Sequence, residues 1–172
     1  GTYTIDPASS ASKTNYKDIG SAISDMVSGS RSDGGTPNGS GISAAVIFNI
    51  ANGNYYGQYS ISTISGTSAS NTVTFQSAKG DSSKVIIRDT VSSSGYTIEL
   101  NGASFTIFRK VSIMGTGATQ SPVSIIGVSY HNSFYKGDGI YTTDKGNLVN
   151  ITYKGIVKLE GNKVVGDNIS YT

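Results

Sequence analysis

The chain has 172 residues, which is enough for one domain, residues 1–172, with a sizeable core. Only 14% of the residues are charged, against roughly a quarter in average soluble domains, and the net charge is +2 with the basic residues scattered. These values argue against a nucleic-acid-binding protein, which needs a basic patch. No apolar run approaches the roughly 18 residues of a membrane span, so we expect no membrane insertion. No cysteine is present to form a disulfide or a thiolate metal site.

The composition favours β-structure. Gly (22 residues), Ser, Thr and Asn are abundant, and there are 11 Tyr and no Trp. Because Thr, Val, Ile and Tyr pack well on pleated surfaces, we expect an all-β protein. No signal peptide opens the chain, so we expect any export signal to have been removed, and the cysteine-free composition is compatible with a secreted or cell-surface location.

One segment, residues 15–28, has a helical pattern. Its apolar residues recur at three- and four-residue steps and fall on one face: Ile19, Ala22, Ile23, Met26 and Val27. Asn15 is the expected N-cap and Gly29 the expected C-terminal stop. A single amphipathic helix ahead of a β-rich chain needs an apolar surface to cover, and we expect it to cap the open end of a sheet stack.

Residues 29–41 follow the helix and contain almost no apolar side chain. Such a segment cannot offset its ordering entropy by burial, so we expect an exposed, flexible loop. Its glycines lack the G-x-x-x-x-G-K-[ST] spacing of a phosphate-binding loop. No phosphate site is therefore predicted here.

From residue 44 onward the chain consists of short apolar or alternating segments, separated by turns such as Asn52-Gly53-Asn54. The predicted strands are Ala45–Ile50, Tyr59–Ile64, Thr72–Ala78, Lys84–Asp89, Tyr96–Leu100, Phe105–Phe108 and Val111–Met114. Val73, Val85, Ile98 and Ile107 are separated by 12, 13 and 9 residues with no helical pattern between them. This spacing is too short for βαβ crossovers.

Two architectures fit such spacing, an antiparallel sandwich and a β-solenoid in which each strand pairs with its counterpart one coil further along. Two-residue hairpin turns are scarce, and the segment Leu100–Phe105 faintly resembles Leu159–Val164. Both features favour the solenoid.

The sequence also resembles a known family, the secreted pectin-lyase-like β-helix regions of Bacteroidetes cell-surface proteins. The resemblance is carried by residues 1–7 (GTYTIDP), 16–27, 45–55 (AVIFNIANGNY), 64–75 (ISGTSASNTVTF) and 96–103 (YTIELNGA). It covers about the first two-thirds of the chain and fades after about Gln120. It implies a right-handed parallel β-helix (β-solenoid) with an N-terminal capping helix and with β coils over residues 44–172.

Residues that could carry chemistry are sparse. His131 is the only histidine, so any Ser-His-Asp triad depends on it, and a structural role is the expectation. Asp138 and Asp144 come closest to the carboxylate pair of a glycosidase, but their surroundings are turn-forming. We therefore predict no catalytic site, no metal site and no cofactor.

Two groups of aromatic residues are candidates for ligand binding. The first combines tyrosines with interleaved amides, and its members are Tyr55, Tyr56, Tyr59, Asn52 and Asn54. The second contains Tyr130, Phe134, Tyr135 and Tyr141. A ring stacks on a pyranose face while amides bind hydroxyl groups, so the first group is a candidate glycan site. Packing of these tyrosines on the solenoid surface is the alternative.

The missing catalytic signatures and the resemblance together favour a non-catalytic extracellular module, a scaffold or adhesin that binds glycans weakly. Two alternatives stay open: a carbohydrate-active β-helix enzyme fragment, either a polysaccharide lyase or a glycoside hydrolase, and a self-assembling fibre subunit with poorly guarded strand edges. Apolar residues continue almost to Thr172 with no helical pattern after Ile169. We expect a folded-back segment, a neighbouring subunit or further coils to cover this end.

Overall fold

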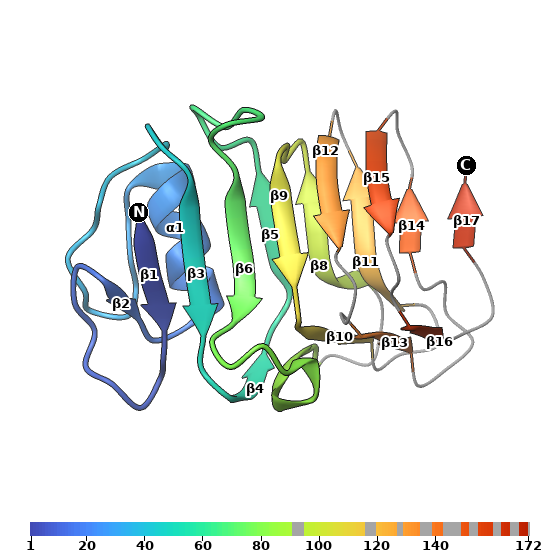
Figure 1. Ribbon diagram of the computed structural model, residues 1–172, viewed down its shortest axis with the longest axis horizontal. Coiled ribbons are helices and arrows are strands. Elements are labelled where there is room, and N and C mark those ends of the chain that lie inside the picture. Colours follow the sequence, from blue (N-terminus) through green and yellow to red (C-terminus); the bar gives the residue numbers. More distant parts are fainter. Residues whose placement is uncertain are drawn as a thin grey trace.

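The computed structural model describes residues 1–90, 95–115, 120–126, 129–134, 139–142, 149–151, 155–159, 163–165 and 169–171 (Figure 1). It contains three β-sheets that run side by side along the long axis of the molecule. Sheet A consists, in spatial order, of β2 (Asn15–Tyr16), β1 (Thr2–Ile5), β3 (Val46–Ile50), β6 (Val73–Ser77), β9 (Thr106–Arg109), β12 (Ser129–Phe134) and β15 (Gly155–Leu159). Sheet B consists of β4 (Gly53–Tyr56), β7 (Val85–Arg88), β10 (Ser112–Gly115), β13 (Gly139–Thr142) and β16 (Lys163–Val165). Sheet C consists of β5 (Tyr59–Ser62), β8 (Gly95–Asn101), β11 (Gln120–Ile126), β14 (Val149–Ile151) and β17 (Ile169–Tyr171).

From β3 onward the chain visits the three sheets in a fixed order, A then B then C. Each strand pairs in parallel with the strand three places later, as in Val46 with Val73 and Tyr55 with Ile87. Every strand pairing among the described residues is parallel. The prediction of an all-β chain is therefore confirmed, and the antiparallel sandwich is wrong.

The core lies between the three sheets, and strands such as β3 and β7 alternate buried and partly exposed side chains along their length. In β6, Val73 and Phe75 are fully buried, while Gln76 is half-buried on the outside. The Phe75 ring stacks between Phe48 and Phe108, at centroid distances of 5.0 and 5.5 Å. One aromatic column therefore joins three neighbouring strands of sheet A through the core.

The α-helix, α1 (Ile19–Ser28), starts later than predicted. Its N-cap is Asp18, whose carboxylate accepts hydrogen bonds from the N–H and the hydroxyl of Ser21. The prediction that Asn15 caps the helix is wrong, because Asn15 and Tyr16 form β2 beside β1 and the Asn15 amide donates to the carbonyls of Asp6 and Ser10. Gly29 ends the helix in the left-handed conformation (φ 68°), as its sequence position predicts.

The apolar face of α1 packs into the core. Ile19, Ala22, Ile23 and Met26 are buried in the same cluster as residues of β1 and β3. In Figure 1 the helix lies behind β1 and β3, at the N-terminal end of the three sheets. The helix therefore shields the first strands from water, and its buried side chains join the core of the sheets.

Residues 29–41 contact α1 and β2 through polar groups. The carboxylate of Asp25, which is only 1% exposed, accepts hydrogen bonds from the Tyr16 hydroxyl (2.6 Å) and from the N–H groups of Asn38 and Gly39. The Asn38 amide donates to the Lys13 carbonyl and the Tyr16 hydroxyl. These hydrogen bonds compensate for the missing apolar burial, and the flexibility of the segment stays a prediction.

A second anchor of this segment is the ion pair between Arg31 and Asp33 (2.7 Å), whose side chains are 0% and 1% exposed. The Arg31 guanidinium lies 3.8 Å from the centre of the Tyr16 ring and donates to the carbonyls of Ser12 and Asn15. Burial works to raise the pKa of Asp33, but hydrogen bonds from Arg31 and from the N–H of Lys17 outweigh it and lower that pKa to about 2.

This lowered pKa predicts an acid-sensitive contribution to stability. Since the folded-state pKa lies below the ordinary value of 3.8, ionised Asp33 stabilises the fold above about pH 4, and this contribution is lost as the pH falls towards 2. We expect Asp33→Asn to lower the free energy of unfolding by roughly 2 kcal/mol at pH 7. Thermal melts of both proteins at pH 7 and pH 2.5 would measure the difference. It should shrink at the lower pH, and an equal difference at both values would contradict the assignment.

Of the strands before residue 116, three were not predicted from the sequence, namely β1, β2 and β4. Beyond Met114 the sequence predicts β coils without assigning individual strands. β4 covers Gly53–Tyr56, where a turn was expected, and it has only one buried side chain, Tyr55. The similarity between Leu100–Phe105 and Leu159–Val164 does not reflect equivalent positions, because Leu100 lies in sheet C and Leu159 in sheet A. The last strand of each sheet is β15, β16 or β17. How their outer edges are covered stays a prediction.

Candidate functional site

The outward side of β4, β7 and β10 forms the candidate site. Alternation in these strands places Tyr55, Ile87 and Ile113 in the core. The neighbouring positions form two rows of register partners on the other side of the strands, Asn54–Ile86–Ser112 and Tyr56–Arg88–Met114. Ser112 is only 4% exposed, and its hydroxyl donates to the Ser82 carbonyl. We call these six residues the sheet B outer face.

Tyr56 and Arg88 dominate this face. Tyr56 is 58% exposed and is the one large hydrophobic side chain that is exposed among the described residues. Arg88 is its register partner on β7, and the guanidinium carbon lies 5.8 Å from the centre of the Tyr56 ring. This distance allows a cation–π contact, and the ring keeps most of its surface in contact with solvent.

The chain turns directly after Tyr56. Gly57 adopts φ 154°, and its N–H donates to the Arg88 carbonyl (3.0 Å). A Cβ atom at Gly57 would lie 3.1 Å from the Tyr59 ring. Any other residue at this position would therefore have both an unfavourable φ and a close contact with that ring. Gly57 therefore fixes the end of β4, and with it the position of Tyr56.

The structure divides the first predicted aromatic group. Tyr55 is 5% exposed, and its hydroxyl donates to the carbonyls of Ala51 and Ile5. Tyr59 is half-buried against the core, and its hydroxyl donates to the Tyr56 carbonyl. Burial raises the pKa of both tyrosines to about 12. These two rings pack inward and stabilise the fold, whereas Tyr56 remains for contact with a ligand.

The two predicted amides lie on the exposed side. Asn52 and Asn54 are both exposed, and Asn54 sits two residues before Tyr56 on the same face of β4. The face therefore presents an amide beside an aromatic ring. Sequence reasoning missed Arg88, because only the pairing of β4 with β7 brings it next to Tyr56.

The second aromatic group contributes one residue to the same row. Tyr141, in β13, is the register partner of Met114, so the row continues as Tyr56–Arg88–Met114–Tyr141 in backbone position. Tyr130 and Phe134 belong to β12 of sheet A. Tyr135 lies outside the described residues.

Of the three residues considered for catalysis, the structure describes only His131. His131 is exposed with φ 55°, and its ring stacks on Phe105 at 5.0 Å with an interplanar angle of 11°. Asp138 and Asp144 lie outside the described residues. In the part of the chain that the structure describes, no group of three His, Asp or Glu side chains could hold a metal ion, and no helix is long and apolar enough to span a membrane.

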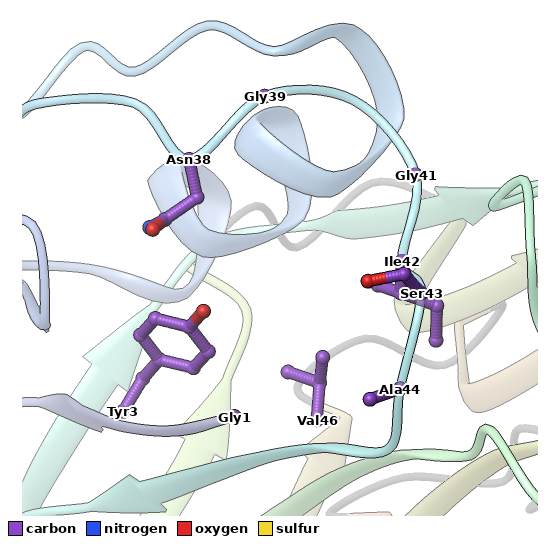
Figure 2. A pocket seen from close by; sticks show the side chains of 9 residues that line it. All are labelled: Gly1, Tyr3, Asn38, Gly39, Gly41, Ile42, Ser43, Ala44 and Val46. Carbon is purple, nitrogen blue, oxygen red and sulfur yellow. The ribbon is translucent and has the colours of Figure 1, made fainter.

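A pocket of about 190 Å³ opens between residues 38–44 and the strands β1 and β3 (Figure 2). Tyr3 and Val46 line one side, and Asn38, Gly39 and Ile42 line the other. A narrower extension reaches Tyr16, Asp25, Met26 and Phe48. The polar groups at its inner end already bind one another, since the Asp25 carboxylate is occupied by Tyr16 and by the N–H groups of Asn38 and Gly39. The Asp25 carboxylate at the inner end of the pocket is therefore already occupied by groups of the protein.

Comparison with protein families, with curated proteins and with solved structures finds no match to this chain.

Proposed function

We propose that the three sheets are the faces of a right-handed parallel β-helix with α1 as its N-terminal cap. The fixed A–B–C order of strands and their parallel pairing support this fold, since each set of three strands then forms one coil. Right-handedness follows from the strong preference of parallel crossover connections for that hand. The resemblance to pectin-lyase-like cell-surface regions supports the same architecture.

We propose further that the chain is a non-catalytic extracellular module, a scaffold or adhesin of the secreted or cell-surface type, that binds a glycan on the sheet B outer face. The observation that carries this proposal is the exposed Tyr56 ring with Asn54 on the same strand and Arg88 in register. An aromatic ring stacks on the apolar face of a pyranose, and amide and guanidinium groups bind its hydroxyl groups. The surface is open rather than enclosed, so binding is weak.

The substitution Tyr56→Ala tests the glycan site. We expect it to weaken binding by about five- to tenfold, because stacking on one aromatic ring contributes roughly 1–1.5 kcal/mol. Tyr56→Phe keeps the ring and should retain most of the affinity. Titration calorimetry with oligosaccharides selected on a glycan array would measure both variants.

A matched control lies on a different sheet. Asn49→Ala removes an outward amide of sheet A and should leave glycan affinity unchanged. Equal affinities of the wild type and Tyr56→Ala would contradict the proposed site. Turnover of a bound polysaccharide that is lost in Asp138→Ala or Asp144→Ala would instead favour the carbohydrate-active enzyme.

A further inference from the structure

The Arg88 guanidinium lacks the partners that such a group normally has. The structure gives its side chain no hydrogen bond or ion pair with any described residue, and its Nε is buried without a hydrogen-bond partner. A guanidinium carries five N–H donors in a rigid planar fork, and its usual partners are oxyanions. Buried polar groups without a partner are uncommon and call for a physical explanation.

Within the strands of sheet B that the structure describes, no acid competes for Arg88. The five strands of sheet B include Arg88 and Lys163 but no Asp or Glu. Lys163 is in register with Gly139, which in turn pairs with Ser112 of the outer face. The nearest carboxylate in sequence, Asp89, is 1% exposed and accepts hydrogen bonds from Gln58 and the Thr90 N–H. The charge on this face is therefore positive, and no carboxylate in its strands neutralises it.

We propose that the sheet B outer face binds a sugar residue that carries an oxyanion, either a carboxylate or a sulfate ester, with Arg88 as the group that recognises the charge. This inference rests on the proposed glycan-binding function and specifies its ligand class. The sugar ring stacks on Tyr56, and the oxyanion accepts hydrogen bonds from the two terminal nitrogens of the guanidinium, because Nε is buried. Asn54 donates to a hydroxyl group of the same residue.

The register of sheet B extends this arrangement along the molecule. Adjacent strands are about 4.8 Å apart, so the row from Tyr56 through Arg88 to Met114 spans roughly 10 Å. A single sugar residue covers only part of this length. The site therefore favours an oligosaccharide that lies along the axis of the coils over a monosaccharide.

Binding of three matched oligosaccharides tests the inference: one neutral, one with a carboxylate and one with a sulfate ester on the same backbone. We expect at least one anionic form to bind ten times or more tightly than the neutral form. Arg88→Gln should remove this preference, while Arg88→Lys should keep part of it, because Lys retains the charge but not the planar fork. Raising the salt concentration should weaken anionic binding in the wild type and not in Arg88→Gln.

The outcomes separate this inference from the function on which it rests. Equal binding of neutral and anionic forms, sensitive to Tyr56→Ala but not to Arg88→Gln, would overturn the oxyanion assignment and leave glycan binding intact. No binding of any oligosaccharide would overturn both. Comparison of the carboxylated and sulfated oligosaccharides decides between the two anions. Thermal melts of Arg88→Gln and Arg88→Lys verify that both variants are folded.

Discussion

Replacing Ile23 by Asp should lower the free energy of unfolding by about 4 kcal/mol. Ile23 is 6% exposed and lies on the face of α1 that packs into the core cluster. The substitution removes an apolar side chain and places a carboxylate where no partner is available. In a chain of this size each kcal/mol corresponds to roughly 2–4 °C, so the thermal midpoint should fall by about 8–16 °C.

Ser24→Asp provides the control for this experiment. Ser24 is the next residue of the same helix and is half-buried, so an added carboxylate there reaches water. Its midpoint should change by less than about 4 °C, corresponding to at most 1 kcal/mol. Equal midpoints for Ile23→Asp and Ser24→Asp would show that α1 does not stabilise the sheets. Circular dichroism during a thermal or urea titration is sufficient to compare them.

The helix was largely predictable because its signal is local. The apolar positions Ile19, Ala22, Ile23 and Met26 define one face at helical spacing, and Gly29 supplies the left-handed stop. The start was misplaced because Asn15 and Asp18 are both good N-cap residues. The pairing of Asn15–Tyr16 with β1 decides between them. The helical pattern itself contains no information about this pairing, because β1 lies outside it.

The strands were predictable where apolar side chains alternate, and less so where they do not. The segment Val73-Thr74-Phe75 predicts β6, whereas β4 has the sequence Gly-Asn-Tyr-Tyr, whose first two residues belong to the predicted turn Asn52-Gly53-Asn54. What makes β4 a strand is its hydrogen bonding with β7, in the register Gly53 with Val85. Pairing between strands that are 32 residues apart leaves no signal in a short window.

The candidate site also depends on contacts between strands that are far apart in the sequence. The sequence identified the Tyr55–Tyr59 group but could not assign its members to the inside or the outside, and the strand alternation then buried Tyr55 and exposed Tyr56. Arg88 was not a candidate, because nothing in its own segment distinguishes it. Its role in the site follows from register alone. The sequence thus predicts the aromatic rings and amides of the site, whereas Arg88, its charged residue, is found only from the strand pairing.

The aromatic column of the core leads to the second large effect: Phe75→Ala should lower the free energy of unfolding by about 3–5 kcal/mol. Phe75 is 0% exposed, and its ring stacks on both Phe48 and Phe108. Truncation to Ala removes two stacking contacts and leaves a cavity in the middle of the column. The neighbouring residues cannot fill this cavity, because the strands hold them in place. Phe75→Leu fills most of the volume and should cost less than half as much.

Gln76→Ala is the matched control, because it lies beside Phe75 in the same strand but faces outward. Its amide donates to the Asn49 side chain (2.8 Å), so the substitution should cost about 1 kcal/mol or less. Urea titrations of the four proteins would rank them as wild type, Gln76→Ala, Phe75→Leu and Phe75→Ala in order of decreasing midpoint. If Phe75→Ala and Gln76→Ala unfold at the same urea concentration, Phe75 is not a core residue and the alternation assigned to β6 is wrong. That result would also remove the basis for placing Tyr56 outside, since the faces of β4 are assigned by the same alternation.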